Sequence, residues 1–335
     1  MKRRLFCAAL VLSTLLPAIY LHAYEEVDTP RWYKGNTHTH TVNSDGDSSP
    51  DVVVRWYREH HYNFVVITDH NFCTDVRGLN AVFAAEGKFL VISGEEVTDS
   101  YESPDGRYAA IHLNAINLGK TLQPAGGGGV VETTQNNVDA INAAGALCHL
   151  NHPNFHWSYT VEEMAAVKNY HLFEVANFSS GCNDTGGGGY PGTEAIWDSL
   201  LARGRRMYAI ASDDAHNFKS FGGEYDNPGR GWVMVRCRKL TVDQIVSALD
   251  RGDFYSSCGV VLEDINIEPG KITIRMSEEE NLEHTVYFIG KGGKTLATVY
   301  NNPAVYRIAG DEDYVRARVV DSNGKIAWTQ PVFIE

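Results

Sequence analysis

The stretch Phe64-Val65-Val66-Ile67-Thr68-Asp69-His70 decides how the rest of this sequence is interpreted. Its first four residues are aromatic or β-branched and apolar, which is typical of a buried strand. Its last two residues, Asp69 and His70, carry side chains that can bind a metal ion. A strand that ends in such residues indicates a functional site at the end of a sheet.

The same change from apolar to polar residues follows three other candidate strands. Ile92 is followed by Ser93-Gly94-Glu95-Glu96, Cys148 by His149-Leu150-Asn151-His152, and Ile210 by Ala211-Ser212-Asp213-Asp214-Ala215-His216. In a barrel of alternating strands and helices, the carboxyl ends of the strands converge on the face that carries the chemistry. We therefore expect these polar side chains to gather on one face of the molecule.

Helical segments separate the candidate strands between Lys34 and about Val261. The expected strands are 64–67, 89–92, 146–148, 173–175, 208–210 and 232–235. The expected helices begin at Ser49-Pro50 and cover 75–86, 135–144, about 161–168 and 193–203. This alternation predicts an α/β fold with a parallel sheet, either open or closed into a barrel. The glycine tracts 126–129 and 186–189 are expected to form surface loops or a lid.

The sequence changes character after about Leu262. Short β-rich segments, separated by turn sequences such as Pro269-Gly270 and Ser322-Asn323-Gly324, replace the alternation. They cover 265–267, 271–275, 286–289, 295–299, 314–320 and 331–334. The pattern predicts a small C-terminal antiparallel β-sandwich over residues 262–335. This module contains His284 but no group of candidate ligands, so we interpret it as structural or docking.

The composition is that of an acidic globular protein. Hydrophobic residues make up 43% of the chain, and 29 Lys and Arg residues face 42 Asp and Glu residues, for a formal net charge of −13. Such an acidic surface repels phosphate backbones, so we expect no nucleic-acid binding through a basic face. Bound cations would neutralise part of the acidity.

Residues 1–23 have the pattern of a cleaved signal peptide. Lys2, Arg3 and Arg4 precede a nearly continuous apolar run from Leu5 to Tyr20, and Ala23 offers a cleavage point. The alternative is an uncleaved anchor, for which the apolar run is short. We therefore expect a periplasmic or secreted protein, with no stable membrane span after processing.

The cysteines do not form a recognisable scaffold. Five remain after residue 23, an odd number, and none stand in a CxxC pair. The pattern excludes a disulfide-stapled fold and a zinc finger. The sequence leaves open whether one disulfide bridge forms between Cys237 and Cys258.

Histidines and carboxylates recur at spacings that suit metal binding. His38 and His40, like Asp214 and His216, are two residues apart and so project to the same side of an extended chain. Asp45 follows in a turn that can fold its carboxylate back towards the first pair. The candidate ligands are His38, His40, Asp45, Asp69 and His70, Glu95 and Glu96, His112, His152, Asp214 and His216. Mixed imidazole and carboxylate ligands suit zinc, manganese or iron, and these are too many for one ion, so we expect two or three ions with a bridging carboxylate.

These motifs closely resemble the PHP (polymerase and histidinol phosphatase) family of metal-dependent phosphoesterases. The matching text is His38-Thr39-His40, Ser44-Asp45-Gly46, Ile67-Thr68-Asp69-His70-Asn71, Gly94-Glu95-Glu96-Val97, Asn151-His152-Pro153 and Ser212-Asp213-Asp214-Ala215-His216, in the family's order. The similarity is closest to exported members with a C-terminal β module, including carbamate-hydrolase-like relatives. It implies a distorted (β/α)7 barrel over residues 24–261, with a trinuclear metal site.

The resemblance also implies how the ligands divide among the ions. His38, His40, Glu96 and Asp214 would hold one ion, and Glu96 would bridge to a second that His112 and His152 also bind. Asp45, His70 and His216 would hold the third, although some relatives carry histidine where Asp45 stands. The family's patterns favour Glu96 over Glu95 and Asp214 over Asp213.

The expected activity is hydrolysis of a phosphate mono- or diester by a hydroxide that bridges the ions. Glu96 is the catalytic bridging ligand, and the candidates for moving the leaving-group proton are Asp69, His149 and His156. Arg230 is the candidate for contacting the substrate phosphate. The expected partner is therefore a small-molecule phosphoester or ester, and the oligomeric state stays open.

Two alternatives remain. The same metals could activate attack on the carbonyl of a carbamate, ester or amide. The chain could instead be a non-catalytic extracytoplasmic protein that binds a glycan or partner through the β module and uses metals only structurally. A full set of ligands favours catalysis, because structural metal sites close their coordination shell with fewer residues.

Overall fold

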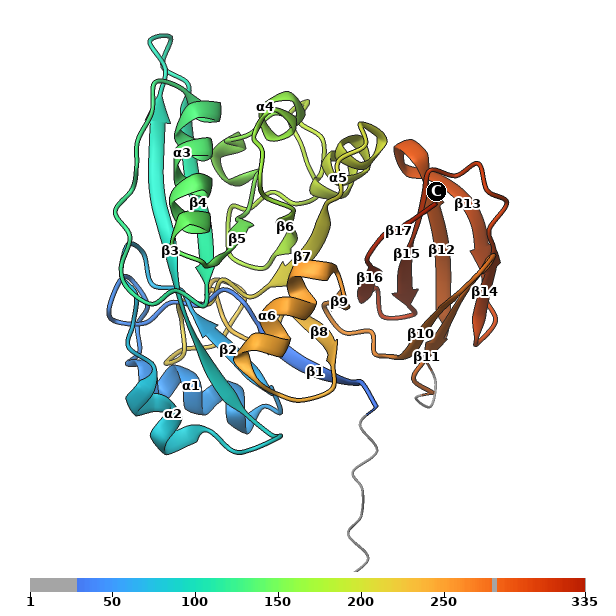
Figure 1. The fold of residues 1–335 in the computed structure, drawn as a ribbon, viewed down its shortest axis with the longest axis horizontal. Coiled ribbons are helices and arrows are strands. Elements are labelled where there is room, and N and C mark those ends of the chain that lie inside the picture. The colour runs from blue at the N-terminus through green and yellow to red at the C-terminus, as the bar shows by residue number, and fades with distance from the viewer. Residues whose placement is uncertain (1–28, 279–281, 335) are drawn as a thin grey trace, which may run out of the picture.

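The computed structural model describes residues 29–278 and 282–334, so the predicted signal peptide lies outside the described residues. The fold is mixed α/β. One large sheet has the strand order β13-β12-β15-β16-β9-β8-β1-β2-β3-β4-β5-β6-β7, and a separate small antiparallel sheet has the order β10-β11-β14. Figure 1 shows the α/β part on one side and the C-terminal strands on the other.

The central strands include all six that the sequence predicts, and five of these, all except β3, begin and end close to the predicted positions. They are β1 Arg31–Asn36, β2 Phe64–Ile67, β3 Leu90–Glu102, β4 Tyr108–Ile116, β5 Leu147–Leu150, β6 Leu172–Asn177, β7 Tyr208–Ser212, β8 Trp232–Cys237 and β9 Phe254–Ser257. β1, β2 and β3 pair in parallel, as do β5, β6 and β7. β1, β4 and β9 were not predicted.

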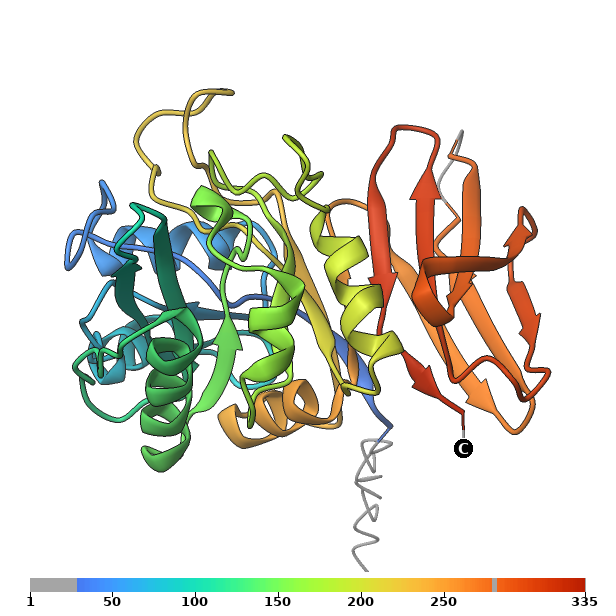
Figure 2. The same ribbon diagram turned by 90° about the horizontal axis from the view of Figure 1, so that it is seen from above.

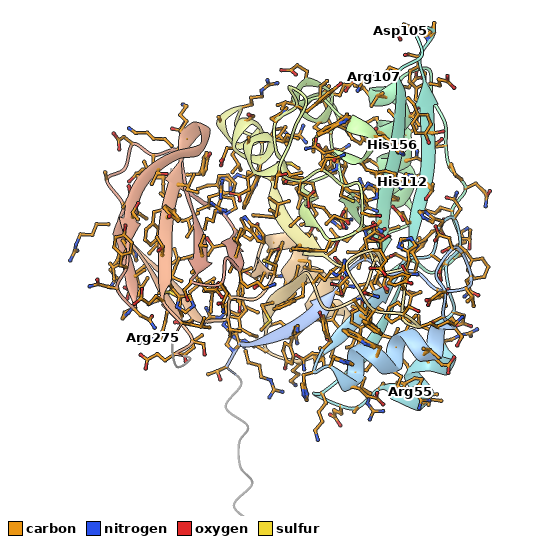
Figure 3. All side chains as sticks on the ribbon, turned by 180° about the vertical axis from the view of Figure 1, so that it is seen from behind. Arg55, Asp105, Arg107, His112, His156 and Arg275 are labelled. Atoms are coloured by element: carbon orange, nitrogen blue, oxygen red, sulfur yellow. The ribbon has the colours of Figure 1, made fainter. Side chains whose placement is uncertain are left out.

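The expectation of a parallel sheet is wrong at two places. β8 pairs antiparallel with both β1 and β9. β3 continues ten residues beyond Ile92, turns at 103–107 and returns antiparallel as β4, which in turn pairs antiparallel with β5. The turn is closed by hydrogen bonds from the backbone N–H of Ser103 to the carbonyl of Arg107 and from Gly106 to Ser103. The hairpin projects from the α/β part, with Asp105 and Arg107 near its tip (Figure 3). Because the chain turns back at this hairpin, His112 lies on the antiparallel strand β4 and not at the end of a parallel strand.

The end of β7 meets the chain that follows β1. Thr39 forms a parallel bridge with Ala215, and the backbone N–H of His40 donates to the carbonyl of Ala215 at 2.9 Å. Further down β7, the Ser256 hydroxyl accepts from the N–H of Ala211 and donates to the carbonyl of Ala209. The segments that follow the first and seventh strands are therefore joined at the end where the polar motifs lie.

Six α-helices cover the α/β part: α1 Pro50–Glu59, α2 Arg77–Phe83, α3 Val130–Ala143, α4 Val161–Ala166, α5 Thr193–Ala202 and α6 Val242–Arg251. α2 is shorter than predicted because Ala84 already has extended backbone angles. α5 packs Trp197 against Phe173 of β6, with ring centroids 6.3 Å apart. Among the described residues, no helix is long and apolar enough to span a membrane.

The C-terminal strands are antiparallel and share a core. They are β10 Leu262–Glu268, β11 Lys271–Met276, β12 His284–Gly290, β13 Lys294–Val299, β14 Ala304–Arg307, β15 Tyr314–Asp321, β16 Ile326–Thr329 and β17 Val332–Phe333. Ile274 from one sheet and Phe288 from the other are both fully buried in this core. β16 pairs with β9, so the larger sheet runs without a break from the α/β part into these strands, which lie beside α5 in Figure 2. Cys237 and Cys258, like the other described cysteines, are unpaired.

Candidate metal centre

The polar residues at the strand ends gather in one place. Three overlapping groups have ligand atoms within 4.8 Å of one another. They are His38, His40, Glu96 and Asp214; His40, Asp45, His70 and His216; and His70, Glu96 and His112. His152 adjoins them, with Nε2 3.3 Å from Glu96 Oε1. All nine residues that the family resemblance implies as ligands are therefore neighbours.

Glu96 lies at the centre of this arrangement and presents one oxygen to each side. Its Oε2 is 3.2 Å from Nε2 of both His38 and His40. Its Oε1 is 3.0 Å from Nδ1 of His112 and 3.3 Å from Nε2 of His152. A carboxylate whose two oxygens face different groups of imidazoles has the arrangement of a bridging ligand.

Glu95 and Asp213, the acidic residues that directly precede Glu96 and Asp214 in the sequence, have other hydrogen-bond partners. Glu95 accepts a hydrogen bond from the backbone N–H of Leu122 at 3.0 Å. Asp213 accepts from the backbone N–H groups of Arg230 and Gly231, at 2.6 and 2.9 Å. The choice of Glu96 over Glu95 and of Asp214 over Asp213 therefore agrees with the side-chain directions.

The donor set fits divalent transition-metal ions. Two ligands that are each about 2.0–2.1 Å from a tetrahedral zinc ion stand roughly 3.3 Å apart, close to the separations around Glu96. His112 Nδ1 is buried and lies 3.0 Å from Glu96 Oε1, yet within the described part of the chain it has no partner in hydrogen-bond geometry. Such an approach without a hydrogen bond suits two ligands that share an ion.

Asp45 forms the outer edge of the centre. Its Oδ1 lies 3.4 Å from His216 Nε2, and its Oδ2 lies 3.5 Å from His70 Nε2. Its side chain is 56% exposed, so this group of ligands faces solvent. The ring of His216 stacks on that of His40, with centroids 4.1 Å apart.

The acidic ligands are held ionised by the imidazoles. Burial raises the pKa of Glu96, but the charges of His70, His38 and His112 outweigh it and hold that pKa well below its usual value. Burial likewise raises the pKa of Asp214, but the charges of His38, His216 and His40 outweigh it and hold that pKa well below its usual value. Both carboxylates are therefore available as anionic ligands at neutral pH.

Sequence analysis missed one carboxylate, Glu174 on β6. It is fully buried, and its Oε1 is 2.8 Å from Nδ1 of His38. Its Oε2 accepts from the backbone N–H of His152 at 2.7 Å. Donation from His38 Nδ1 to Glu174 leaves the Nε2 lone pair free to face Glu96, as outer partners of metal-binding histidines do. The available signal was a charged residue in the middle of an otherwise apolar, fully buried strand.

The three candidate proton carriers, Asp69, His149 and His156, differ in burial and in hydrogen-bond partners. Asp69 accepts from the backbone N–H and hydroxyl of Thr41 and from the Thr74 hydroxyl, which ties it into the loop after β1. His149 is buried beside Glu174, and burial lowers its pKa to about 4. His156 is exposed on the segment after His152, near His112 in Figure 3. None of the three is among the residues that line the cavity described next.

A cavity of about 330 Å³ opens over the ligands. It is lined by Asp45, His70, Glu96, His112, His152, Phe155, Ser179, Ser180, Cys182, Asp214, His216 and Asp226. This set contains no Lys or Arg. The guanidinium of Arg230 instead donates to the carbonyl of Gly222 at 2.8 Å and to that of Phe178 at 3.4 Å, so it braces the loops beside the cavity.

We predict opposite effects of pH on the stability of the metal-free protein and on its metal affinity. Burial lowers the pKa of His216, but the hydrogen bond and charge of Asp45 and the charge of Asp214 raise it from 6.5 to about 9. A raised histidine pKa stabilises the folded state fully below pH 6.5, and this contribution is lost as pH rises through about 9. Metal binding needs the neutral imidazole, so affinity rises over the same interval.

Calorimetric unfolding between pH 6 and pH 10, with chelator and with added zinc, measures both effects. At about 1.36 kcal/mol per pKa unit, His216 contributes at most roughly 3 kcal/mol to the metal-free protein. His216→Gln removes the titrating group and is expected to flatten the metal-free profile. An equally steep profile in this variant would contradict the assignment.

Comparisons with known proteins bear on the fold. No protein-family profile matches the sequence, and no curated protein matches it significantly. A two-domain protein from Bacteroides vulgatus ATCC 8482, which contains a predicted PHP-like metal-dependent phosphoesterase, has a similar structure. The TM-score is 0.50 and the identity 16%, over 90% of this chain and 96% of that chain.

Two other structures are similar over a smaller part of the chain. An amidohydrolase from Chromobacterium violaceum, with bound sulfate and no metal, has a TM-score of 0.38 and 14% identity, over 55% of this chain and 88% of that chain. A protein from Bifidobacterium adolescentis ATCC 15703, whose name proposes a metal-dependent phosphoesterase, has a TM-score of 0.39 and 14% identity, over 59% of this chain and 91% of that chain. The expectation from the motifs is therefore confirmed at the level of the fold, by the Bacteroides structure: this chain has the fold of the PHP-like metal-dependent phosphoesterases.

Proposed function

We propose that this protein is a metal-dependent hydrolase that cleaves a phosphate mono- or diester. The observation that carries the proposal is the position of Glu96, whose two oxygens face different groups of histidines at 3.0–3.3 Å beneath an open cavity. A structural metal site closes its coordination shell, whereas a catalytic site leaves room for water and substrate. The open cavity supports the catalytic alternative over the binding protein.

The ligands would divide among three ions in the way that the motifs imply. His38, His40, Glu96 and Asp214 would hold the first, Glu96, His112 and His152 the second, and Asp45, His70 and His216 the third. Zinc, manganese or iron ions held there would make hydroxide available from water near neutral pH and would stabilise negative charge on the substrate.

The residues of the chain then position the substrate and keep the ligands in the correct state. Glu174 orients His38, and Ser179 and Ser180 are among the residues that line the cavity. Burial opposes ionisation of Asp45, but hydrogen bonds from His216 and His70 hold its pKa well below its usual value. Asp45 therefore serves as an anionic ligand and not as a proton donor.

Hydrolysis of a carbamate or ester carbonyl is the second candidate. The observation that favours it is the lack of Lys or Arg among the residues that line the cavity. A phosphate group would have to be recognised by the metal ions and by hydroxyl and N–H groups alone. A neutral carbamate or ester has no such requirement.

Several finer features belong to the same proposal. The ring from β1 to β7 is interpreted as a distorted (β/α)7 barrel over residues 24–261, and residues 262–335 as a β-sandwich module. The protein is expected to act on a small molecule in the periplasm or outside the cell, after removal of residues 1–23. The bridge between Thr39 and Ala215, which joins the segments that follow the first and seventh strands, supports the barrel interpretation.

The test combines metal content with turnover of three substrates. We expect two or three ions per chain, and hydrolysis of p-nitrophenyl phosphate or of bis-p-nitrophenyl phosphate faster than of naphthyl N-methylcarbamate. His38→Ala and Asp214→Ala each remove a ligand of the first ion and are expected to abolish that activity. Faster carbamate cleavage would replace the first candidate by the second, and bound metal without turnover would favour the binding protein.

A further inference from the structure

The segment that follows His152 has an unusual backbone. Phe155–Trp157 form the short 3₁₀-helix η1, in which His156 and Trp157 have φ values of 52° and 55°. Bulky residues rarely adopt this left-handed conformation, and it persists only where surrounding contacts enforce it. Such strain is concentrated at binding and catalytic sites.

Contacts with the loop that carries the second glycine tract hold this segment in place. Asn154 Nδ2 donates to the carbonyls of Asn183 and Pro191, at 3.1 and 3.0 Å. Asn183 Nδ2 donates back to the carbonyl of Asn154 at 3.2 Å. The ring of Trp157 stacks on that of Tyr190, with centroids 4.6 Å apart and 18° between the planes.

The result of this arrangement is the placement of Phe155. Its ring lines the cavity, with its centroid 5.1 Å from that of His152 and 6.2 Å from that of His112. Phe155 and Cys182 are the apolar members of the cavity lining, and Phe155 supplies its one phenyl ring. We call this pair the apolar wall. It stands beside the His112 and His152 side of Glu96.

The remaining lining limits the charge of a ligand. Asp226 and Asp45 contribute carboxylates, and within residues 29–278 and 282–334 no Lys or Arg lines the cavity to neutralise additional anionic groups. A ligand with one anionic group at the metal ions is therefore accommodated, whereas a second anionic group would meet carboxylates. The apolar wall can bury a flat, uncharged ring next to the reacting group.

We infer that Phe155 is a specificity-determining residue that binds the uncharged aryl group of an aryl phosphoester. The inference rests on the proposed phosphoester hydrolysis, and it adds the class of leaving group. Phe155 contacts the ring of the substrate, while the strained segment and the Trp157–Tyr190 stack fix its position. Substrates with small polar alcohols, such as glycerol phosphate, fill the same metal site without this contact.

The test compares phenyl phosphate with glycerol 1-phosphate in the full metal-loaded protein. Phe155→Ala is expected to lower kcat/KM for phenyl phosphate about tenfold more than for glycerol 1-phosphate, a discrimination typical of lost apolar contact in a pocket. Phe155→Leu is expected to recover part of the loss. Tyr300→Ala, at an aromatic position that is 75% exposed in the C-terminal strands, is the control and is expected to change neither value.

A binding measurement separates this inference from the proposed function. Calorimetry with phenylphosphonate and methylphosphonate, which are not hydrolysed, is expected to show tighter binding of the phenyl compound. Phe155→Ala should remove that preference without changing the metal content. Equal losses on both substrates, or equal affinities for both phosphonates in the wild type, would overturn the inference. Failure to hydrolyse any phosphoester while the phenyl preference persists would overturn the proposed function and leave the apolar wall in place.

Discussion

Replacing Glu96 by glutamine is expected to remove at least one metal ion from each chain and to reduce kcat/KM more than about a hundredfold. Changes to residues that merely orient metal ligands cost about 10–100-fold, so loss of a ligand shared by two ions exceeds that range. The carboxamide has one oxygen, whereas the Glu96 carboxylate presents one oxygen to each of two groups of histidines. Metal analysis after dialysis and steady-state kinetics measure the two effects.

Glu95→Gln is the matched control for this variant. The two glutamates are adjacent on β3 and both fully buried, but Glu95 faces away from the centre and accepts from Leu122. Burial raises the pKa of Glu95 to about 7, so the neutral amide resembles a form that it already adopts. We expect normal metal content and activity. If the Glu95 variant lost metal and the Glu96 variant did not, the assignment of the bridging ligand would be wrong.

Replacing Arg316 by alanine is expected to lower the free energy of unfolding by about 3–5 kcal/mol, the usual effect of leaving one member of a buried ion pair without its partner. Arg316 on β15 is 1% exposed, and its Nε and Nη2 donate to the two carboxylate oxygens of Asp198 on α5, at 2.8 and 2.7 Å. The Tyr314 hydroxyl also donates to Asp198. Because α5 packs on β6, which carries Glu174, we also expect weaker metal binding in this variant.

Arg318→Ala is the control, since Arg318 lies two residues away on the same strand and is 36% exposed. It contacts Glu194 at 3.2 Å, and an exposed pair of this kind contributes at most about 1 kcal/mol. Chemical denaturation of both variants gives the comparison. The combined change Arg316→Met with Asp198→Leu is expected to restore much of the lost stability, because no buried charge is left alone. Equal losses in the Arg316 and Arg318 variants would contradict the role of the buried pair.

The sequence alone was sufficient to predict local features that depend on residues close together along the chain. Apolar runs such as 64–67 and 208–210 became strands, because a short continuous apolar run that is buried on both faces is encoded within a few residues. The HxH and DxH spacings put His38 beside His40 and Asp214 beside His216. The rule that chemistry lies at the carboxyl ends of strands then brought His70, Glu96, His152, Asp214 and His216 to one expected site.

Long-range contacts decided what the sequence did not reveal. Glu174 is 136 residues from His38 along the chain, and only the packing of β6 in the sheet brings the two together. The antiparallel return of β4 is the reason that His112 faces Glu96, and no local pattern around His112 predicted a strand.

The candidate roles of individual polar residues also depended on tertiary structure. The sequence identified Asp69 and Arg230 as groups capable of catalysis or phosphate binding. In the fold, the hydroxyl groups of Thr41 and Thr74 donate hydrogen bonds to the Asp69 carboxylate. The Arg230 guanidinium donates to the carbonyls of Phe178 and Gly222. Residue type and spacing determined which chemistry this protein can carry. The tertiary structure decided how those groups are oriented, because hydrogen bonds to distant partners fix the direction of each side chain.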